Sequence, residues 1–140
     1  MRYVLLLLVC VFTVGCNTTP EPPEQRLFDT WEVVSRATLA TDRQTEGLDR
    51  VQFNHLLTLL EIGMADHRYE FRRSGDLAFG MDLLKPIAHF KIIQKKRGHL
   101  TLELKDVGQG SGRVENAKAW FVGDQLHLQR GTQTLVLAPD

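Results

Sequence analysis

The sequence predicts a mainly β protein, an up-and-down antiparallel barrel of about eight strands with one short helix inserted after the first strand. Three observations carry this prediction. From Trp31 onward, apolar and polar residues alternate in short segments, which is the period of a strand with one buried face. Turn residues separate consecutive segments, as in a meander of hairpins. One stretch, residues 49–64, replaces the alternation with helical spacing.

The first four segments each direct alternate apolar side chains to one face. The turn signals "RRSGD" and "KKRG" mark hairpins among them. The side chains expected to face inward are Trp31, Val33, Ala37 and Leu39 in "WEVVSRATL", Tyr69 and Phe71 in "HRYEF", Leu77, Phe79 and Met81 in "LAFGM", and Phe90 and Ile92 in "HFKII".

The later segments continue the meander through "HLTLELK", "ENAKAWFV", "LHL" and "TLVLA". Leu100, Leu102 and Leu104 share the buried face of the first of these. If the alanines and phenylalanine of "ENAKAWFV" face inward, Trp120 and Val122 face outward. Two outward apolar residues either pack under the helix or the N-terminal segment, or mark a contact surface.

The helical stretch is "LDRVQFNHLLTLLEIGM". We expect a helix of roughly 13 residues, capped by Asp49 and ended by Gly63. Its apolar stripe must cover something, most simply one mouth of the barrel, either as a permanent lid over the aromatic hairpin or as a gate to a ligand site. The stripe consists of Phe53, Leu56, Leu57, Leu60 and Met64.

The chain opens with "VLLLLVCVFTVGCN", a charged head, a short apolar run and a small-residue exit. This pattern is typical of a signal peptide, and the run is shorter than the roughly 20 apolar residues of a membrane span. "TVGC" resembles a bacterial lipobox. The resemblance implies cleavage before Cys16, a diacylglycerol on its thiol and an acyl chain such as palmitate on its amine. An ordinary secreted protein cut nearby is the alternative.

The predicted organisation is a lipoprotein signal peptide (1–15), a Pro-rich tether with the lipidated Cys16 (16–26) and one barrel domain (27–140). Cys10 would leave with the signal peptide, so no disulfide is expected despite the even cysteine count. Asn17 follows Cys16. In lipoproteins of enteric-type bacteria, Asp at that position favours inner-membrane retention, so we expect a cell-envelope protein on the periplasmic side of the outer membrane, where the source has one.

The tether "NTTPEPPEQ" has no apolar side chain beyond its three prolines, and we expect it to be extended. Seventeen basic residues balance 17 acidic ones in the whole chain. A nucleic-acid-binding protein would show a basic excess, so no nucleic-acid partner is expected. The basic run "KKR", residues 95–97, is interpreted as a hairpin tip.

In their order and spacing, "LFDTWEVVS", the helical insert, "YEFRRSGDLAF", "HLTLEL" and "VGDQLHL" resemble the small bacterial lipocalin-like lipoproteins. The similarity spans Leu27 to Leu137. The resemblance implies a barrel or half-open barrel without a shared catalytic residue. Candidate core or ligand-pocket residues are Trp31, Leu57, Leu60, Tyr69, Phe71, Phe79, Met81 and Phe90.

No residue pattern predicts catalysis. The five histidines have no HxH or HExxH spacing, and without a mature cysteine no metal or other cofactor is expected. "GQGSG", residues 108–112, precedes a strand and is interpreted as an inter-strand loop, not a phosphate loop or a nucleophile elbow. We expect no enzyme.

Two functions remain. One is an envelope lipoprotein with an interaction or structural role toward an unknown envelope protein. The alternative is a carrier of a small apolar ligand in the barrel mouth. Bulky inward side chains favour the first, because an eight-stranded barrel encloses little more than its own side chains.

Overall fold

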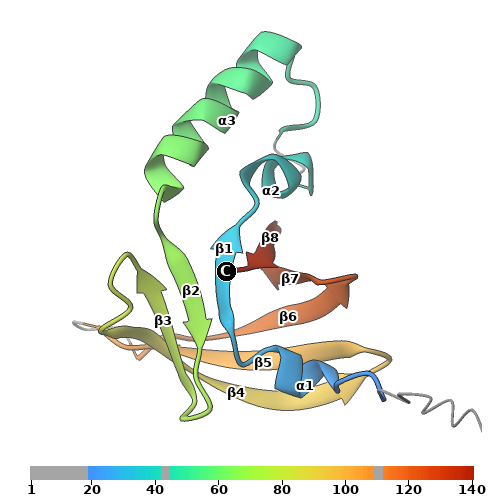
Figure 1. Cartoon of the computed structure of the whole chain (residues 1–140), viewed down its shortest axis with the longest axis vertical. Coiled ribbons are helices and arrows are strands. Elements are labelled where there is room, and N and C mark those ends of the chain that lie inside the picture. Colours follow the sequence, from blue (N-terminus) through green and yellow to red (C-terminus); the bar gives the residue numbers. More distant parts are fainter. Residues whose placement is uncertain (1–18, 42–44, 109–111) are drawn as a thin grey trace, which may run out of the picture.

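The computed structural model describes residues 19–41, 45–108 and 112–140 of the chain. The predicted signal peptide, Cys10, the lipidation site Cys16 and residues 109–111 of the glycine loop lie outside the described residues. Eight strands form one closed antiparallel barrel in which each strand pairs with the next and the last pairs with the first (Figure 1). The predicted fold class is confirmed, and this architecture is compatible with a lipocalin-like fold.

The strands are β1 (Thr30–Val33), β2 (Arg68–Phe71), β3 (Asp76–Gly80), β4 (Pro86–Lys96), β5 (His99–Asp106), β6 (Val114–Val122), β7 (Gln125–Arg130) and β8 (Gln133–Pro139). Closure rests on the β1–β8 pairing, in which Trp31 lies opposite Pro139 and Val33 opposite Leu137. Because the side-chain period of a strand is two, this register directs Trp31 and Leu137 to the same inner side of the barrel.

The core follows the predicted alternation. Leu100, Leu102 and Leu104 of β5 are buried, and each lies beside an inward residue of the neighbouring strands. The alanines Ala117 and Ala119 of β6 are also buried, which leaves room for the leucines opposite them. The most deeply buried large side chains are Phe71, Leu27, Leu77, Leu100, Leu102, Leu104, Leu126, Leu128, Leu137 and Val136.

The first strand is shorter than predicted. β1 ends at Val33, and the segment expected to continue it forms a helix, α2 (Ser35–Thr41). The hydroxyl of Thr38 accepts a hydrogen bond from the Val136 backbone N–H at 2.9 Å, so α2 lies against β8. It thereby helps to bury Val136, whose side chain is on the outer face of its strand. Because Val136 is apolar and faces outward, another element must cover it, and the local alternation does not show which one.

The predicted inserted helix is confirmed as α3 (Arg50–Met64). The Asp49 carboxylate accepts hydrogen bonds from the backbone N–H groups of Val51 and Gln52, both at 2.8 Å. The Gln52 side chain accepts one from the Asp49 N–H at 3.1 Å, which completes a capping box. The helix runs one residue past Gly63, the predicted end.

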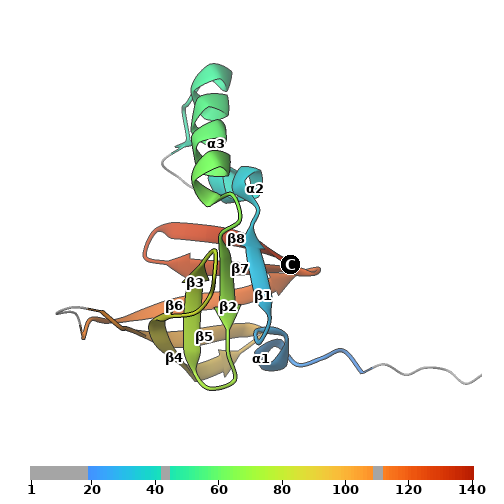
Figure 2. The ribbon, with the colours of Figure 1, turned by 60° about the vertical axis from the view of Figure 1, so that its left-hand side comes forward.

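The predicted position of α3 is wrong. It packs on α2 and extends away from the barrel, as both views show (Figures 1 and 2). Leu57 of α3 is buried, but it is not part of the barrel core. The stripe therefore does not dock on Tyr69, Phe71 and Phe79. Because β1 is followed by the helix α2, α3 packs on α2 and not on the mouth of the barrel.

The end of the tether is not extended as predicted. Residues Pro23–Arg26 form a short helix, α1, which begins with proline, a residue that the first helical turn tolerates. Glu24 forms an ion pair with Lys95 at 2.6 Å, and Arg26 donates a hydrogen bond to the Gly123 carbonyl at 2.6 Å. Leu27, which follows, is completely buried. The chain thus closes the end of the barrel at which β1 begins, called here the α1 end.

Candidate functional site

The barrel interior was the first candidate site, and five of its predicted residues lie there. Trp31, Phe71 and Phe90 belong to the buried core, and Tyr69 packs against it. Phe79 stacks on Tyr69 with ring centroids 4.5 Å apart. The Trp31 indole N–H donates a hydrogen bond to the Leu27 carbonyl at 3.2 Å, which ties the core to the α1 end.

Three other predicted residues lie outside the barrel interior. Met81 follows the end of β3 and is 67% exposed, so its predicted place beside Leu77 is wrong. The alternation does not continue to Met81, because Gly80, with a φ of +136°, ends the strand. Leu57 and Leu60 lie on α3, buried and half-buried respectively, and do not line a barrel mouth.

A charged pair occupies the mouth opposite the α1 end. Glu115 lies opposite Leu104 and Arg130 opposite Ala117, so both project to the inner side like these core partners. Their side chains form an ion pair. Burial raises the pKa of the nearby Tyr69, while the Arg130 charge acts in the opposite direction. An apolar ligand entering here would have to displace or desolvate an ion pair, which is costly.

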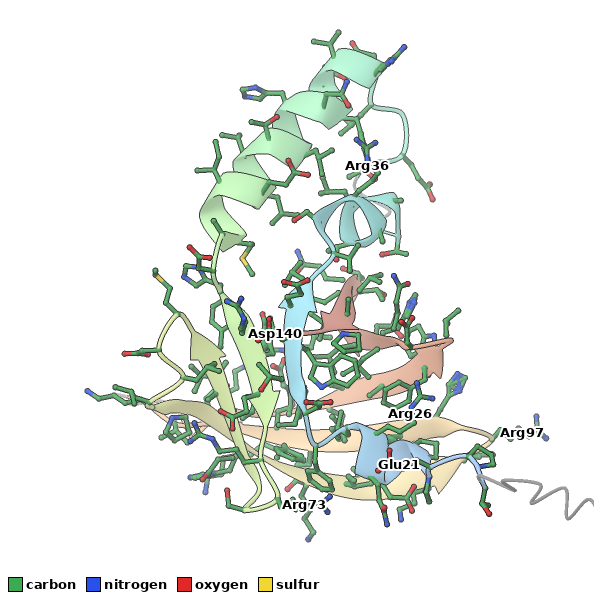
Figure 3. The ribbon with its side chains drawn as sticks, in the orientation of Figure 1. Glu21, Arg26, Arg36, Arg73, Arg97 and Asp140 are labelled. Carbon is green, nitrogen blue, oxygen red and sulfur yellow. The ribbon has the colours of Figure 1, made fainter. Side chains whose placement is uncertain are left out.

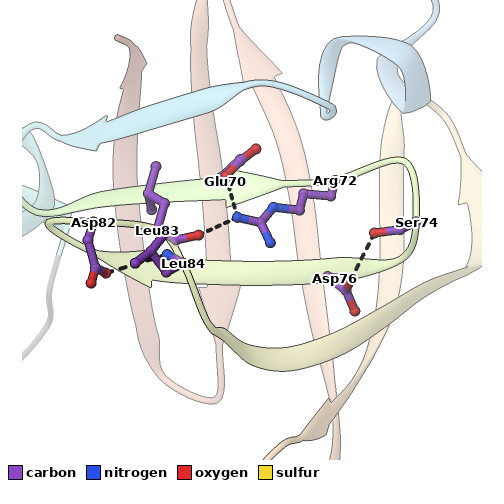
Figure 4. Close-up of polar contacts among 7 residues, drawn as sticks. All are labelled: Glu70, Arg72, Ser74, Asp76, Asp82, Leu83 and Leu84. Carbon is purple, nitrogen blue, oxygen red and sulfur yellow. Dashed lines mark hydrogen bonds and ion pairs between the residues drawn. The ribbon is translucent and has the colours of Figure 1, made fainter.

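Polar contacts within the chain fix the β2–β3 hairpin beside this interior (Figure 4). Arg72 forms an ion pair with Glu70 at 2.9 Å and donates a hydrogen bond to the Leu83 carbonyl. In the turn, the Ser74 hydroxyl donates to the Asp76 carboxylate at 2.9 Å. The Arg72–Leu83 bond holds the loop after β3 against the hairpin, and the other two contacts lie within the hairpin.

The outer face of the barrel carries a second candidate site across β5, β6 and β7. The register places His99 opposite Trp120 and Trp120 opposite His127, so the three rings form one row. Their centroids are 5.5 Å and 5.4 Å apart. The alternation correctly predicted that Trp120 faces outward, but its ring neighbours are these two histidines, not α3 or the tether.

A polar row runs parallel to the aromatic row, one register step away. Thr101 lies opposite Lys118, Lys118 opposite Gln129, and Gln129 opposite Thr134, with Gln94 of β4 opposite Thr101. We call the two rows together the Trp120 face. Its members are His99, Trp120 and His127 in the aromatic row, and Gln94, Thr101, Lys118, Gln129 and Thr134 in the polar row.

Two cavities on this face meet at Gln129. One, of about 400 Å³, lies beside the indole and is lined by Thr41, Trp120, Gln129, Gly131, Thr132 and Thr134. The other, of about 450 Å³, is lined by Gln94, Lys96, Arg97, His99, Thr101, Lys118 and Gln129. Figure 3 shows Arg97 at the tip of the β4–β5 hairpin, pointing away from the barrel.

His127 lies at the β7 end of the aromatic row. Burial lowers its pKa, so the imidazole is neutral at neutral pH. Its Nε2 is buried and has no hydrogen-bond partner among the described residues. The pairing that brings His127 to Trp120 depends on strand register, which no single segment of the sequence predicts.

The remaining histidines do not converge. His89 bonds Asp76 at 2.7 Å, and His67 contacts the Phe79 ring. The described residues hold no group of three or more His, Cys, Asp or Glu side chains placed to bind a metal ion. In the same part of the chain, no helix has the length and hydropathy that a membrane crossing requires.

Comparison with known proteins gave no match. No family model, no curated protein and no solved structure is significantly similar to this chain.

Proposed function

We propose that this protein is a non-catalytic cell-envelope lipoprotein, anchored through Cys16, whose filled barrel is a scaffold for recognition at the Trp120 face. The lipobox-like "TVGC" supports the anchor, and the expected destination is the periplasmic side of an outer membrane. Acyl chains stabilise membrane attachment by about 0.8 kcal/mol per buried methylene, so two or three chains hold the protein firmly.

The packing of the barrel carries the choice between scaffold and carrier. Leu102 of β5 and Leu126 of β7 are both completely buried, and the charged Glu115–Arg130 pair occupies the mouth. An eight-stranded barrel has room for little beyond such side chains. The two cavities at Gln129 lie on the outer face, so the outer face is the better ligand site.

The contacts of α1 support an orientation on the membrane. Because Glu24 and Arg26 bond the barrel, the part of the tether from Cys16 to Pro22 can span at most about 20 Å, at roughly 3.3 Å per residue. The α1 end therefore faces the bilayer, while the helices α2 and α3 point away from it. The Trp120 face lies on the side wall of the barrel, where an envelope partner can reach it.

A titration with a dansyl-labelled fatty acid tests the scaffold against the carrier. The full chain in detergent micelles should show no saturable, one-to-one binding in the micromolar range, which corresponds to about −8 kcal/mol. Empty micelles serve as the blank. Saturable binding that unlabelled palmitate displaces would contradict the scaffold and favour the carrier of an apolar ligand.

The anchor has its own test. Cys16→Ser should leave an unprocessed or wrongly processed chain without lipid, while the matched variant Cys10→Ser should be processed normally. Mass spectrometry of the membrane fraction measures both outcomes. An unacylated Cys16 in the mature protein would remove the lipoprotein from the proposal and leave the filled barrel.

A further inference from the structure

We infer that the Trp120 face binds an acidic glycan, a chain of sugar rings that carries carboxylate or phosphate groups. This inference rests on the proposed function, because it names the ligand class of the surface proposed there. Three features carry it: a row of flat rings, a parallel row of mostly neutral hydrogen-bonding groups, and three cations in the second cavity that form no ion pair with another described residue.

The aromatic row suits the apolar faces of sugar rings. A pyranose presents C–H groups on its faces and hydroxyls around its edge. Trp120 offers a large, rigid ring at the edge of the 400 Å³ cavity, and His99 and His127 extend the row over three strands. Because burial keeps His127 neutral, this side of the indole carries no charge that would repel C–H groups.

The polar row suits the edges of the same rings. The amides of Gln94 and Gln129 each donate and accept hydrogen bonds, and the hydroxyls of Thr101 and Thr134 do both as well. The register spaces these groups along a line beside the aromatic row. Gln129 lines both cavities, so one extended ligand can contact Trp120 and the second cavity at once.

The charges select an acidic ligand. Lys96, Arg97 and Lys118 line the second cavity, and none forms an ion pair with another described residue. An arginine guanidinium binds carboxylates and phosphates with paired hydrogen bonds, and a lysine adds a point charge. A neutral glycan would leave all three cations unused.

Single-stranded nucleic acid also combines rings with negative charge, but it fits this face less well. Its backbone carries a phosphate at every nucleotide, and proteins that bind it line the groove with cations. The three cations Lys96, Arg97 and Lys118 all line the second cavity, and the lining of the cavity beside Trp120 includes none. Acidic groups spaced along a chain of hydroxylated rings match this pattern better.

A calorimetric titration of the full chain in micelles tests the inference with a galacturonate hexasaccharide, neutral maltohexaose and a dT12 oligonucleotide. We expect the acidic hexasaccharide to bind with a Kd below about 1 mM and at least about tenfold more tightly than maltohexaose. Its affinity should fall when the salt concentration rises from 0.05 M to 0.5 M, because exposed charges are screened.

Variants locate the binding. Trp120→Ala should weaken binding about tenfold or more, and Gln129→Ala, at a half-buried polar position on the outer face, about threefold or more. Lys118→Ala should weaken binding and flatten the salt dependence. Lys91→Ala is the matched control, because Lys91 faces outward on β4, opposite Glu103, and lines neither cavity. Circular dichroism verifies the fold of each variant.

The inference is overturned if the folded protein binds no acidic hexasaccharide, if Lys91→Ala weakens binding as much as Lys118→Ala, or if dT12 binds more tightly. The fatty-acid probe separates this result from failure of the proposed function. If neither the fatty acid nor the glycan binds, the glycan inference is wrong and the proposed scaffold function stands. If the fatty acid binds inside and Trp120→Ala has no effect on it, the scaffold itself is wrong.

Discussion

The barrel and the helical arm formed by α2 and α3 are stabilised in different ways. Every strand of the barrel is hydrogen-bonded on both sides, and its interior is a continuous cluster of leucines and aromatic residues. α3 packs on the seven-residue helix α2 and has one buried side chain, Leu57. On α3, Val51, Leu59 and Ile62 are 77%, 54% and 71% exposed.

The difference indicates that stability is unevenly distributed along the chain. Isolated helices of fewer than about 12–15 residues are marginal in water, so a 15-residue helix with one packed stripe needs its cap and α2. The barrel, in contrast, can lose a strand only by breaking two ladders and opening the core. The arm should therefore open locally at lower free energy than the barrel unfolds.

The largest expected effect is in the barrel core. Trp31→Ala should lower the free energy of unfolding by roughly 3–5 kcal/mol, because it removes a buried aromatic ring and its hydrogen bond to Leu27. A typical domain has about 5–15 kcal/mol in total, so much of the variant should be unfolded. Denaturant melts measure the change. A loss below about 1 kcal/mol would mean that Trp31 does not support the core.

Leu57→Ala should open the arm without opening the barrel. Removing a buried leucine costs about 2–5 kcal/mol, and the lower end is expected where the neighbours can collapse. Hydrogen exchange should show faster exchange of the amides in residues 50–64, while those of β5 keep their protection. Equal loss of protection in β5 would show that arm and barrel unfold as one unit.

Asp49→Ala tests the cap of α3. Two backbone N–H groups lose their acceptor, so the helix should be destabilised by about 1 kcal/mol. Asp49→Asn is the matched control, because asparagine caps helices about as well as aspartate. Amide exchange in the first turn of α3 measures both. An equal effect of the two substitutions would assign the role to charge rather than to the hydrogen bonds.

A smaller effect is expected from pH at the β2–β3 turn of the barrel. Hydrogen bonds from Ser74 and then from His89 hold the pKa of Asp76 below its usual value of 3.8. The stabilisation from Asp76 is therefore complete above that value and is lost as the pH falls through the lower pKa of the folded state. Asp76→Asn should flatten this acid-side slope in denaturant melts. An unchanged slope would show that other carboxylates account for it.

The smallest effect is expected on the outer side of the arm. Ile62→Lys should change the free energy of unfolding by no more than about 0.5 kcal/mol, because Ile62 is 71% exposed and is not part of the barrel core cluster. Thermal melts at several protein concentrations measure it. A clear loss that depends on protein concentration would show that this face is covered in solution.

The sequence by itself determined the eight strands and the inward side of nearly all of them. Alternation in "HLTLELK" identified Leu100, Leu102 and Leu104 as core, and alternation in "ENAKAWFV" placed Trp120 outside. The Asp49 cap and the helix after it were also predictable. These features depend on local period and local hydrogen bonds, which a few neighbouring residues carry.

Only the tertiary structure decided how these elements meet. The closure of β1 on β8, the helical continuation after Val33 and the position of α3 depend on partners about a hundred residues apart or on which apolar surface lies nearest. The same holds for the Trp120 face, whose rings come from three strands and meet only through register. A strand's own period fixes which side a residue faces, but the neighbour on that side is chosen by long-range pairing.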